Sequence, residues 1–378
     1  MNFKFMATCL FGLEHILGEE IDALGYKRIE TIDGHVIFEG DISAIPRSNI
    51  WLRTAERVFI LVGRYKAETF TDLFDGAYYL PWEEWIGKND AFPVKGHSVK
   101  SRLYSIPDCQ SIVKKAVVKR LSDKYGVSWF SETGTKYQIE FLILKDEAFL
   151  MIDTSGIALH KRGYRPQTTI SPIRETLAAA LAKLARPRED VLFWDPFCGS
   201  ATIPIEASLI MTNTAPGIGR GFISEGFSNI GESAWKNARE EAKSLVKCDS
   251  SFEAYASDID EDALKSARSA VSKAGMNAHI KVFKKNALEI ETEGRRGTVV
   301  CNPPYGERLG TLSEAEELYK RMGAHFKTLG SWQIYVITSH ERFERLYGRR
   351  ADKVRKLYNG MIPCYYYQFF KKDIKNDL

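Results

Sequence analysis

Four consecutive residues, Asn302-Pro303-Pro304-Tyr305, follow a short apolar run and could hold an amine for chemistry. An exocyclic amine on a nucleic-acid base is a poor nucleophile because its lone pair is delocalised into the ring. The Asn302 side-chain oxygen and the Pro303 carbonyl can accept the two amine hydrogens and so localise the lone pair toward a methyl donor. The two prolines stiffen the loop, and Tyr305 can stack on a base that has left its helix. The loop predicts methylation of a base amine, and a proline-rich turn without chemistry is the alternative.

Cys301, directly before this loop, offers a different chemistry, because a thiolate can add to a pyrimidine ring. It stands at the end of an apolar strand, where a small buried thiol is the usual outcome. We therefore expect Cys301 to be structural.

A second loop, DPFCGSAT, joins a predicted buried strand to a predicted helix. Gly199 and the small Ser200 let the backbone approach a ligand, and the helix start offers free N–H donors. Asp195 can hold an ammonium group, which suits S-adenosylmethionine (SAM), because its methionine tail carries both charges. The GxGxxG spacing of dinucleotide sites and the GxxxxGK[ST] spacing of triphosphate sites are absent. We predict cofactor contacts here, with a structural turn as the alternative, from Asp195, Pro196, Phe197, Cys198, Gly199, Ser200 and Thr202.

Two further strand ends carry candidate cofactor contacts. Asp258, followed by Ile259, ends the next predicted strand, where an acidic residue typically binds ribose hydroxyls. Asp260 is better placed to cap the following helix. Asn286, followed by Ala287, ends the third strand and could meet the adenine of the cofactor, although a surface turn is as good an interpretation.

The elements that must position these loops alternate along the second half of the chain. Short apolar strands are predicted at 191–194, 254–257, 279–283, 298–301 and 333–338, with helices between them, which favours a doubly wound, mainly parallel sheet. The final strand, 365–370, could close that sheet as an antiparallel edge. Residues 212–249 are too long for a simple connection, so we expect either a substrate wall or a purely structural excursion that ends in a helix over 232–247.

The first half is typical of an α+β region. Residues 3–9 and 34–39 are predicted strands around a helix near 13–24, which Gly25 is placed to end. A second helix over 111–124 has one apolar face, and strands are predicted at 136–144 and 148–153. A boundary between the halves is expected near 153–167, where glycine and proline interrupt the pattern.

The bulk composition is that of an ordinary globular protein of 378 residues with a net charge of +4. No apolar run approaches membrane-spanning length, and residues 1–17 lack a cleavage site, so we expect no membrane segment, no signal peptide and a cytoplasmic location. The six cysteines form no CxxC pair, so we predict no metal site and no disulfide frame. Basic residues cluster at 94–120 and 160–165, and charge alone favours phosphate contacts and solvated surface equally.

Taken together, these residues resemble the class I SAM-dependent N-methyltransferases. The segments FPVKGHSVKSRLYSIPDCQSIVKKAVVKRL, ALHKRGYR and SPIRETLAAAL narrow the resemblance to THUMP-containing RNA methyltransferases. The nearest group is the bacterial 23S rRNA guanine-N2-methyltransferases (RlmL-like), which are also labelled N6-adenine-specific DNA methylases. The resemblance covers roughly residues 3–370.

This resemblance implies a Rossmann-like methyltransferase domain with a doubly wound, mainly parallel seven-stranded sheet, preceded by an α+β ferredoxin-like and THUMP region. It implies three domains: 1–58 (ferredoxin-like), 59–160 (THUMP, RNA-binding) and 161–378 (methyltransferase). SAM is the implied cofactor and RNA the implied partner, with no obligate protein partner. The region 171–176 is expected beside the cofactor, through Arg174 and Glu175. The expected RNA contacts are Lys95, His97, Lys100, Arg102, Lys161, Arg162 and Arg165, with a fold-holding role the equal alternative for His97.

Two positions depart from the related sequences. Ala201 stands where many have glycine, which is tolerable if the backbone there is helical. Asn286 stands where many have aspartate, which puts its role in doubt. The larger RlmL proteins carry a second methyltransferase domain, and we expect this chain to have a single methylation activity.

The leading hypothesis is guanine-N2 methylation of 23S rRNA. Methylation of tRNA guanine N2 is the nearest rival, because THUMP enzymes that act on tRNA share the arrangement. DNA adenine-N6 methylation and a non-catalytic RNA-binding assembly factor are the alternatives from other classes.

Overall fold

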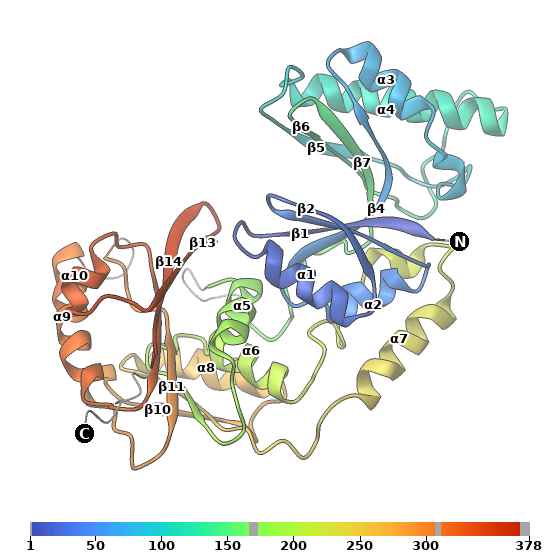
Figure 1. Ribbon diagram of the computed structural model, residues 1–378. Coiled ribbons are helices and arrows are strands. Elements are labelled where there is room, and N and C mark those ends of the chain that lie inside the picture. The colour runs from blue at the N-terminus through green and yellow to red at the C-terminus, as the bar shows by residue number, and fades with distance from the viewer. Residues whose placement is uncertain (1, 166–172, 307–310, 371–378) are drawn as a thin grey trace. The chain divides into compact units, whose positions relative to one another are not determined.

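The computed structural model describes residues 2–165, 173–306 and 311–370. The chain forms two compact units, each built on a seven-stranded sheet (Figure 1). The first unit comprises Met1–Cys9, Leu17–Leu159 and Gly219–Glu241, and the second comprises Leu10–Ile16, His160–Ile218 and Ala242–Leu378.

The sheet of the first unit has the strand order β2-β3-β1-β4-β7-β6-β5. Figure 1 shows α3 and α4 together on one side of β5, β6 and β7. Glycine in the left-handed conformation ends α4 at Gly126, with φ +65°. The strands are β1 Phe3–Cys9, β2 Lys27–Ile32, β3 His35–Gly40, β4 Ala55–Lys66, β5 Val94–Val99, β6 Ile139–Leu144 and β7 Glu147–Asp153; the helices are α1 Glu14–Ala23, α2 Ala44–Trp51, α3 Phe70–Tyr78, η1 Trp82–Glu84 and α4 Ile106–Tyr125.

Strand β4 joins the ferredoxin-like and THUMP-like parts into one sheet. Its first residues pair with β1, up to Ile60 opposite Phe5, and its later residues pair with β7, from Phe59 opposite Asp153 to Lys66 opposite Glu147. The expected boundary between residues 58 and 59 lies inside this strand. The division into three domains remains a proposal.

The excursion over 212–249 contributes a substantial segment to the first unit. It contains η2 (Ile223–Gly226) and α7 (Glu232–Ser244). The Ser224 hydroxyl donates to the Thr154 carbonyl at 2.6 Å, and the ring of Phe227 stacks on that of Tyr137 at 4.1 Å. Arg47 pairs with Glu241 at 2.9 Å. These contacts make the segment a structural part of that unit.

The second unit has the strand order β10-β9-β8-β11-β12-β14-β13, with β14 antiparallel to both of its neighbours and the other pairs parallel. This confirms the doubly wound sheet and the antiparallel final strand that the sequence predicts. The strands are β8 Leu192–Asp195, β9 Ala254–Asp258, β10 Ile280–Lys284, β11 Gly297–Cys301, β12 Gln333–Thr338, β13 Lys353–Asn359 and β14 Ile362–Phe369; the helices are α5 Glu175–Ala185, α6 Thr202–Met211, α8 Glu261–Lys273, η3 Ala287–Glu289, α9 Leu312–Lys327 and α10 Phe343–Tyr347.

Helices cover both faces of this sheet: α5, α6 and α8 lie on one side, and α9 and α10 on the other (Figure 1). The core under α9 brings Trp194 and Val299 from the sheet against Tyr319 and Met322 from the helix. Burying these large side chains holds the strands in register, so the loops at their carboxyl ends are fixed relative to one another.

None of the helices in the described part of the chain is both long enough and apolar enough to cross a membrane.

Candidate active site

The two loops with predicted chemistry leave neighbouring strands at the same edge of the sheet. Val299 of β11 lies opposite Trp194 of β8, so Asp195 and Asn302 follow at the carboxyl ends of paired strands. Strands β9 and β10 extend to one side of β8, whereas β11 and β12 lie on the other, so the strand order reverses between β8 and β11. In open α/β sheets this reversal opens a crevice that binds ligands.

Asp195 is a buried carboxylate that lacks a cationic partner among the described residues. It is 1% exposed, and one oxygen accepts a hydrogen bond from the Phe197 amide at 3.1 Å. Burial raises its pKa well above the usual range, and the charge of Asp258 raises it further. A ligand that brings an ammonium group would supply the missing counter-charge, so the site fits the methionine end of SAM.

Asp258 holds the cofactor loop in place. One carboxylate oxygen accepts from the Gly199 amide at 3.0 Å, and the other accepts from the Asp260 amide at 3.1 Å. Each oxygen keeps a second lone pair, so ribose hydroxyls could still donate to it. Asp260 caps α8 by accepting from the Asp262 amide at 2.9 Å, which confirms that prediction. The neighbouring Ile259 is 65% exposed.

Gly199 leaves room for a ligand. Its φ is +51°, and a Cβ added there would meet nothing within 4 Å. Phe197 is also partly exposed, whereas the other predicted contacts of this loop are buried: Pro196, Cys198, Ser200 and Thr202. The accessible part of the loop is therefore centred on Gly199.

Ala201 adopts a left-handed conformation, with φ +58° and ψ +27°. Alanine was expected to be tolerable at this position if its backbone were helical. The backbone of Ala201 is not in the right-handed helical conformation, and α6 starts at the next residue, Thr202. A side chain in this conformation costs on the order of 1 kcal/mol or more relative to glycine. The protein thus carries local strain at the start of the cofactor helix.

Replacing Ala201 with glycine is expected to raise the free energy of unfolding by about 1 kcal/mol, because the strain is relieved. Urea unfolding of the purified protein measures this. Ala263→Gly, inside α8, is the matched control and should lower the free energy of unfolding by a similar amount. A destabilised Ala201→Gly protein would show that the backbone at this position is not strained.

Asn286 caps η3 through its side-chain oxygen, which accepts from the Leu288 amide at 3.0 Å. The amide NH₂ of Asn286 remains available to donate, so this residue is better suited to a ring nitrogen of adenine than to its amine. Ala287 is buried at the start of η3.

A buried polar network lies next to the cofactor loop. Arg165 donates to the Ile173 carbonyl at 2.6 Å and to the Thr202 hydroxyl at 3.2 Å, and it lies 3.5 Å from Glu175. Glu175 is 2% exposed, and burial raises its pKa. Its Oε2, the oxygen near Arg165, accepts no hydrogen bond from any residue that the structure describes, so a donor from a ligand could be accommodated there. Arg174 is the N-cap residue of α5; of the predicted stretch 171–176, residues 171 and 172 lie outside the described part of the chain.

The predicted RNA contacts at 161–165 differ in exposure. Lys161 is exposed, whereas the Arg162 side chain is 3% exposed and pairs with Glu206 at 3.4 Å. The Tyr164 hydroxyl donates to the same carboxylate at 2.9 Å. The structure therefore gives Arg162 and Arg165 internal partners within the second unit.

The other predicted RNA contacts lie on the first unit. Lys95 and His97 are two residues apart on the edge strand β5, and Lys95 pairs with Glu140 at 3.1 Å. His97 is exposed, which argues against a fold-holding role. Lys100 has φ +50° and is exposed, and the nearby Arg102 pairs with Glu68 at 2.5 Å while remaining 67% exposed.

In the Asn302 loop, Tyr305 donates a hydrogen bond from its hydroxyl to the Asn302 side-chain oxygen. The hydroxyl is buried, which raises the pKa of Tyr305 well above its usual value, although the residue as a whole is only half-buried. The Pro303 carbonyl accepts no hydrogen bond from any described residue, so it is available as an acceptor. Residues 307–310, which complete the NPPYGERLG motif, lie outside the described part of the chain.

Tyr319 of α9 supports this loop and escaped the sequence analysis. Its hydroxyl donates to the Pro304 carbonyl at 2.8 Å and contacts the Thr338 hydroxyl at 3.0 Å. In the sequence Tyr319 reads as an ordinary core residue on the apolar face of a helix, so no local signal marks it. Cys301, as expected, is buried, and burial raises the pKa of its thiol.

We expect Tyr319→Phe to lower kcat by about ten-fold, because the loop loses one anchor and the acceptors shift from their positions. The Kd for SAM should stay within about two-fold of the wild-type value, since the hydroxyl does not reach the cofactor loop. Tyr347→Phe, in the same core, is the matched control and should leave kcat unchanged. Steady-state kinetics and calorimetry measure both; an unchanged kcat in Tyr319→Phe would remove the positioning role.

Models of three protein families match consecutive parts of the chain. The RlmL ferredoxin-like domain matches residues 4–59, the THUMP domain matches 67–153, and the RMKL-like methyltransferase domain matches 162–368.

Individual proteins are similar over nearly the whole chain. YpsC of Bacillus subtilis (strain 168), which bears the name of an RNA methyltransferase, is 45% identical over 98% of this chain and 97% of its own. The crystal structure of a "possible methylase" from Clostridium difficile 630 is 40% identical with a TM-score of 0.96, and each chain is covered over 100%. The structure of SMU.472, a methyltransferase by name and complexed with SAH, is 38% identical over 99% of both chains with a TM-score of 0.93.

A longer relative matches through part of its length. The ribosomal RNA large subunit methyltransferase K/L of Syntrophotalea carbinolica is 32% identical over 96% of this chain and 52% of its own. The present chain thus spans about half the length of such relatives. On the family matches and the extent of the similarity, the chain belongs to the RMKL-like methyltransferases, with RlmL ferredoxin-like and THUMP domains ahead of the methyltransferase domain.

Proposed function

We propose that this protein methylates the exocyclic N2 amine of a guanosine in 23S rRNA. The observation that carries the proposal is the pairing of β8 with β11, which brings the Asp195 loop and the Asn302 loop to one crevice. The cofactor is SAM, as the sequence predicts: the chain is a methyltransferase, and the similar SMU.472 structure holds SAH, the product that SAM leaves.

In this proposal each loop has a separate task. SAM supplies a methyl group that already carries positive character, so the protein mainly aligns and stabilises. Asp195 balances the ammonium group, and Gly199 lets the cofactor lie close to the backbone. Asn302 and Pro303 accept the two hydrogens of the target amine, which turns its lone pair toward the methyl group.

The Tyr305 hydroxyl has a defined part in the same arrangement. It donates to the Asn302 oxygen, which identifies that atom as the acceptor and fixes the orientation of the side-chain amide. The oxygen has a second lone pair, so the target amine can share it with the tyrosine. Tyr305 is only half-buried as a residue, and its ring has the proposed task of stacking on the base.

RNA is the proposed substrate because of the THUMP domain and because the relatives are named as RNA and ribosomal RNA methyltransferases. Guanine N2 is taken from the RlmL-like resemblance, since the loop itself suits several amines. The same chemistry on tRNA is the nearest alternative.

Nucleoside mass spectrometry of rRNA from a deletion strain tests the proposal. We expect one N2-methylguanosine to disappear from 23S rRNA and to return when the wild-type gene, but not Asn302→Ala, is supplied. Loss from tRNA instead would move the substrate to tRNA, and retention of every N2-methylguanosine in both RNAs would contradict the proposal.

A further inference from the structure

A pocket of about 140 Å³ lies at the amino ends of β8, β11 and β12. This is the edge of the sheet opposite to the Asp195 and Asn302 loops, so the pocket is separate from the candidate active site. Three arginines line it: Arg186, Arg188 and Arg296. Among the described residues that line it, the others are polar or small and none is aromatic.

The positive charge of this pocket is largely uncompensated. Arg186 and Arg188 are exposed and have no carboxylate within ion-pair distance among the described residues. Arg296 pairs with Asp190 at 3.0 Å, but both side chains are well exposed, so this pair opens at little cost. The pocket therefore has two guanidinium groups without a paired carboxylate among the described residues and a third in a solvent-exposed pair, a charge that attracts an anion.

Uncharged donors complete the pocket. The Tyr335 hydroxyl donates to the Gln333 side-chain oxygen at 2.9 Å, which leaves the Gln333 NH₂ group free to donate. Burial raises the pKa of Tyr335, and the charges of Arg186 and Arg188 act in the opposite direction. Thr298 supplies a hydroxyl at the start of β11. The lining thus offers side-chain donors to a bound anion from the starts of two strands, β11 and β12, and from the end of α5.

The backbone of Arg186 gives an independent indication. Arg186 ends α5 in the left-handed conformation, with φ +51° and ψ +65°. Glycine is usual at such a helix end, because a side chain there is strained. The chain carries an arginine instead, and that arginine lines the pocket. This position therefore adds an arginine to the pocket where a glycine would be unstrained.

We propose that this pocket binds phosphate groups of the RNA backbone. The planar forks of arginine match phosphate oxygens in pairs, and a lining without aromatic side chains recognises phosphate rather than a base. The proposal rests on RNA being the substrate and adds a contact remote from the target nucleotide. Such a contact would position the RNA without reading its sequence.

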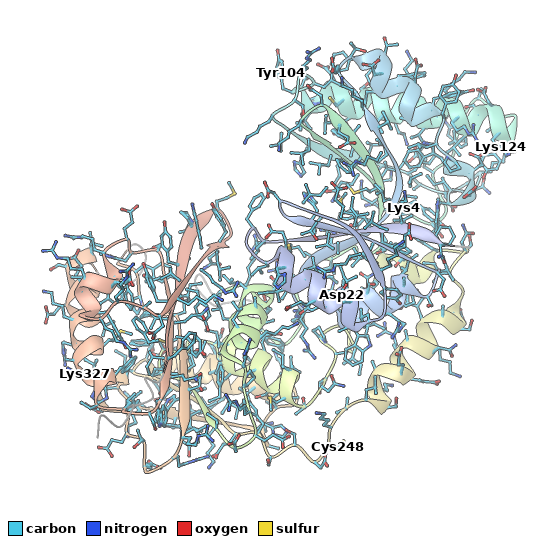
Figure 2. The ribbon with its side chains drawn as sticks, in the orientation of Figure 1. Lys4, Asp22, Tyr104, Lys124, Cys248 and Lys327 are labelled. Carbon is cyan, nitrogen blue, oxygen red and sulfur yellow. The ribbon has the colours of Figure 1, made fainter. Side chains whose placement is uncertain are left out.

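Binding to a labelled mixed-sequence oligoribonucleotide across a salt series tests this directly. The pocket variant is Arg186→Gly/Arg188→Gln/Arg296→Gln. The control, Lys273→Gln/Arg321→Gln/Lys327→Gln, removes three charges from α8 and α9 of the same unit; Lys327 lies at the end of α9 (Figure 2). We expect the pocket variant to bind about ten-fold more weakly and its log–log salt slope to fall by about 2, at roughly 0.7–0.9 per phosphate contact. The control should stay within about two-fold.

Two further measurements test whether the pocket variant is still folded and whether the ligand is RNA or a free phosphate compound. Arg186→Gly alone should keep or raise the Tm, because glycine relieves the strain, while still weakening RNA binding. A pocket variant that binds RNA like the control overturns the proposal. Calorimetry with inorganic pyrophosphate tests whether the ligand is a free phosphate compound instead of RNA. If the pocket variant loses pyrophosphate binding but binds RNA as the wild type does, the pocket is assigned to a free phosphate compound and RNA is rejected. Because the readout is binding and not methylation, the result does not depend on guanine N2 being the target.

Discussion

Replacing Asn302 with alanine is expected to lower kcat by roughly 10²–10³-fold, because the amine loses the acceptor that localises its lone pair in the transition state. The Tyr305 hydroxyl would also lose its acceptor, although the ring can remain in place. The Kd for SAM should change by less than about two-fold, since the cofactor is held from the Asp195 side of the crevice. Single-turnover methylation and calorimetry separate the two quantities.

The structure supplies a control for this substitution. Asn277 is an exposed asparagine just after α8, so Asn277→Ala removes the same group far from the loop and should leave kcat unchanged. Asn302→Asp keeps the acceptor geometry and should retain part of the activity. If Asn302→Ala loses SAM binding and turnover equally, Asn302 has a structural role and the proposed chemistry at this loop is wrong.

The substitution Asp195→Asn should weaken SAM binding by about 10–100-fold, because the ammonium group loses a charge-assisted partner. The stability of the protein without SAM should increase, whereas its affinity for SAM decreases. Its buried carboxylate has no cationic partner among the described residues, and an amide of the same shape removes that unfavourable charge. We therefore expect unliganded Asp195→Asn to be more stable than the wild type at pH 7.

The pH dependence has a definite sign. The folded-state pKa of Asp195 is raised, so the folded protein binds more protons than the unfolded chain above the ordinary aspartate range. The contribution of Asp195 to the free energy of unfolding is therefore largest at low pH, and it decreases as the pH rises toward the raised pKa. In Asp195→Asn this dependence disappears.

Thermal unfolding from acid to neutral pH, with and without SAM, measures both effects. Asp262→Asn is the matched control, because Asp262 is an exposed carboxylate in the same unit and should leave SAM binding unchanged. Wild-type SAM affinity in Asp195→Asn would contradict the assigned role. If the wild-type protein binds no SAM at all, the non-catalytic alternative is favoured.

The sequence predicts the second unit well for a physical reason. Buried parallel strands are short apolar runs, and the helices between them have apolar faces, so Val299 and Val300 or Ile334 to Ile337 mark their strands clearly. Strand β13, Lys353–Asn359, was missed because polar and apolar residues do not alternate clearly along it and only Leu357 is buried. Strand β4 was also missed, and its length, which joins two parts of one sheet, has no local signature.

The site was predicted as a set of residue types, but their interactions depend on the fold. Asp195 and Asn302 could be placed at strand ends, whereas the burial of Asp195 and the bond from Tyr305 to Asn302 depend on packing. Ala201 shows the same limit, because φ cannot be read from the residue type. The basic run at 161–165 suggested exposed cations, and two of its arginines are instead held by Glu206 and Glu175.

Methylation of separated nucleic acids tests the central claim most directly. The purified protein would be incubated with methyl-labelled SAM and with 23S rRNA, 16S rRNA, tRNA or duplex DNA taken from a deletion strain, and the labelled nucleosides identified by mass spectrometry. We predict label in N2-methylguanosine from 23S rRNA, and labelling roughly 10²–10³-fold slower when the protein is Asn302→Ala. Label in N6-methyladenine of duplex DNA, or no label in any RNA, would contradict the account.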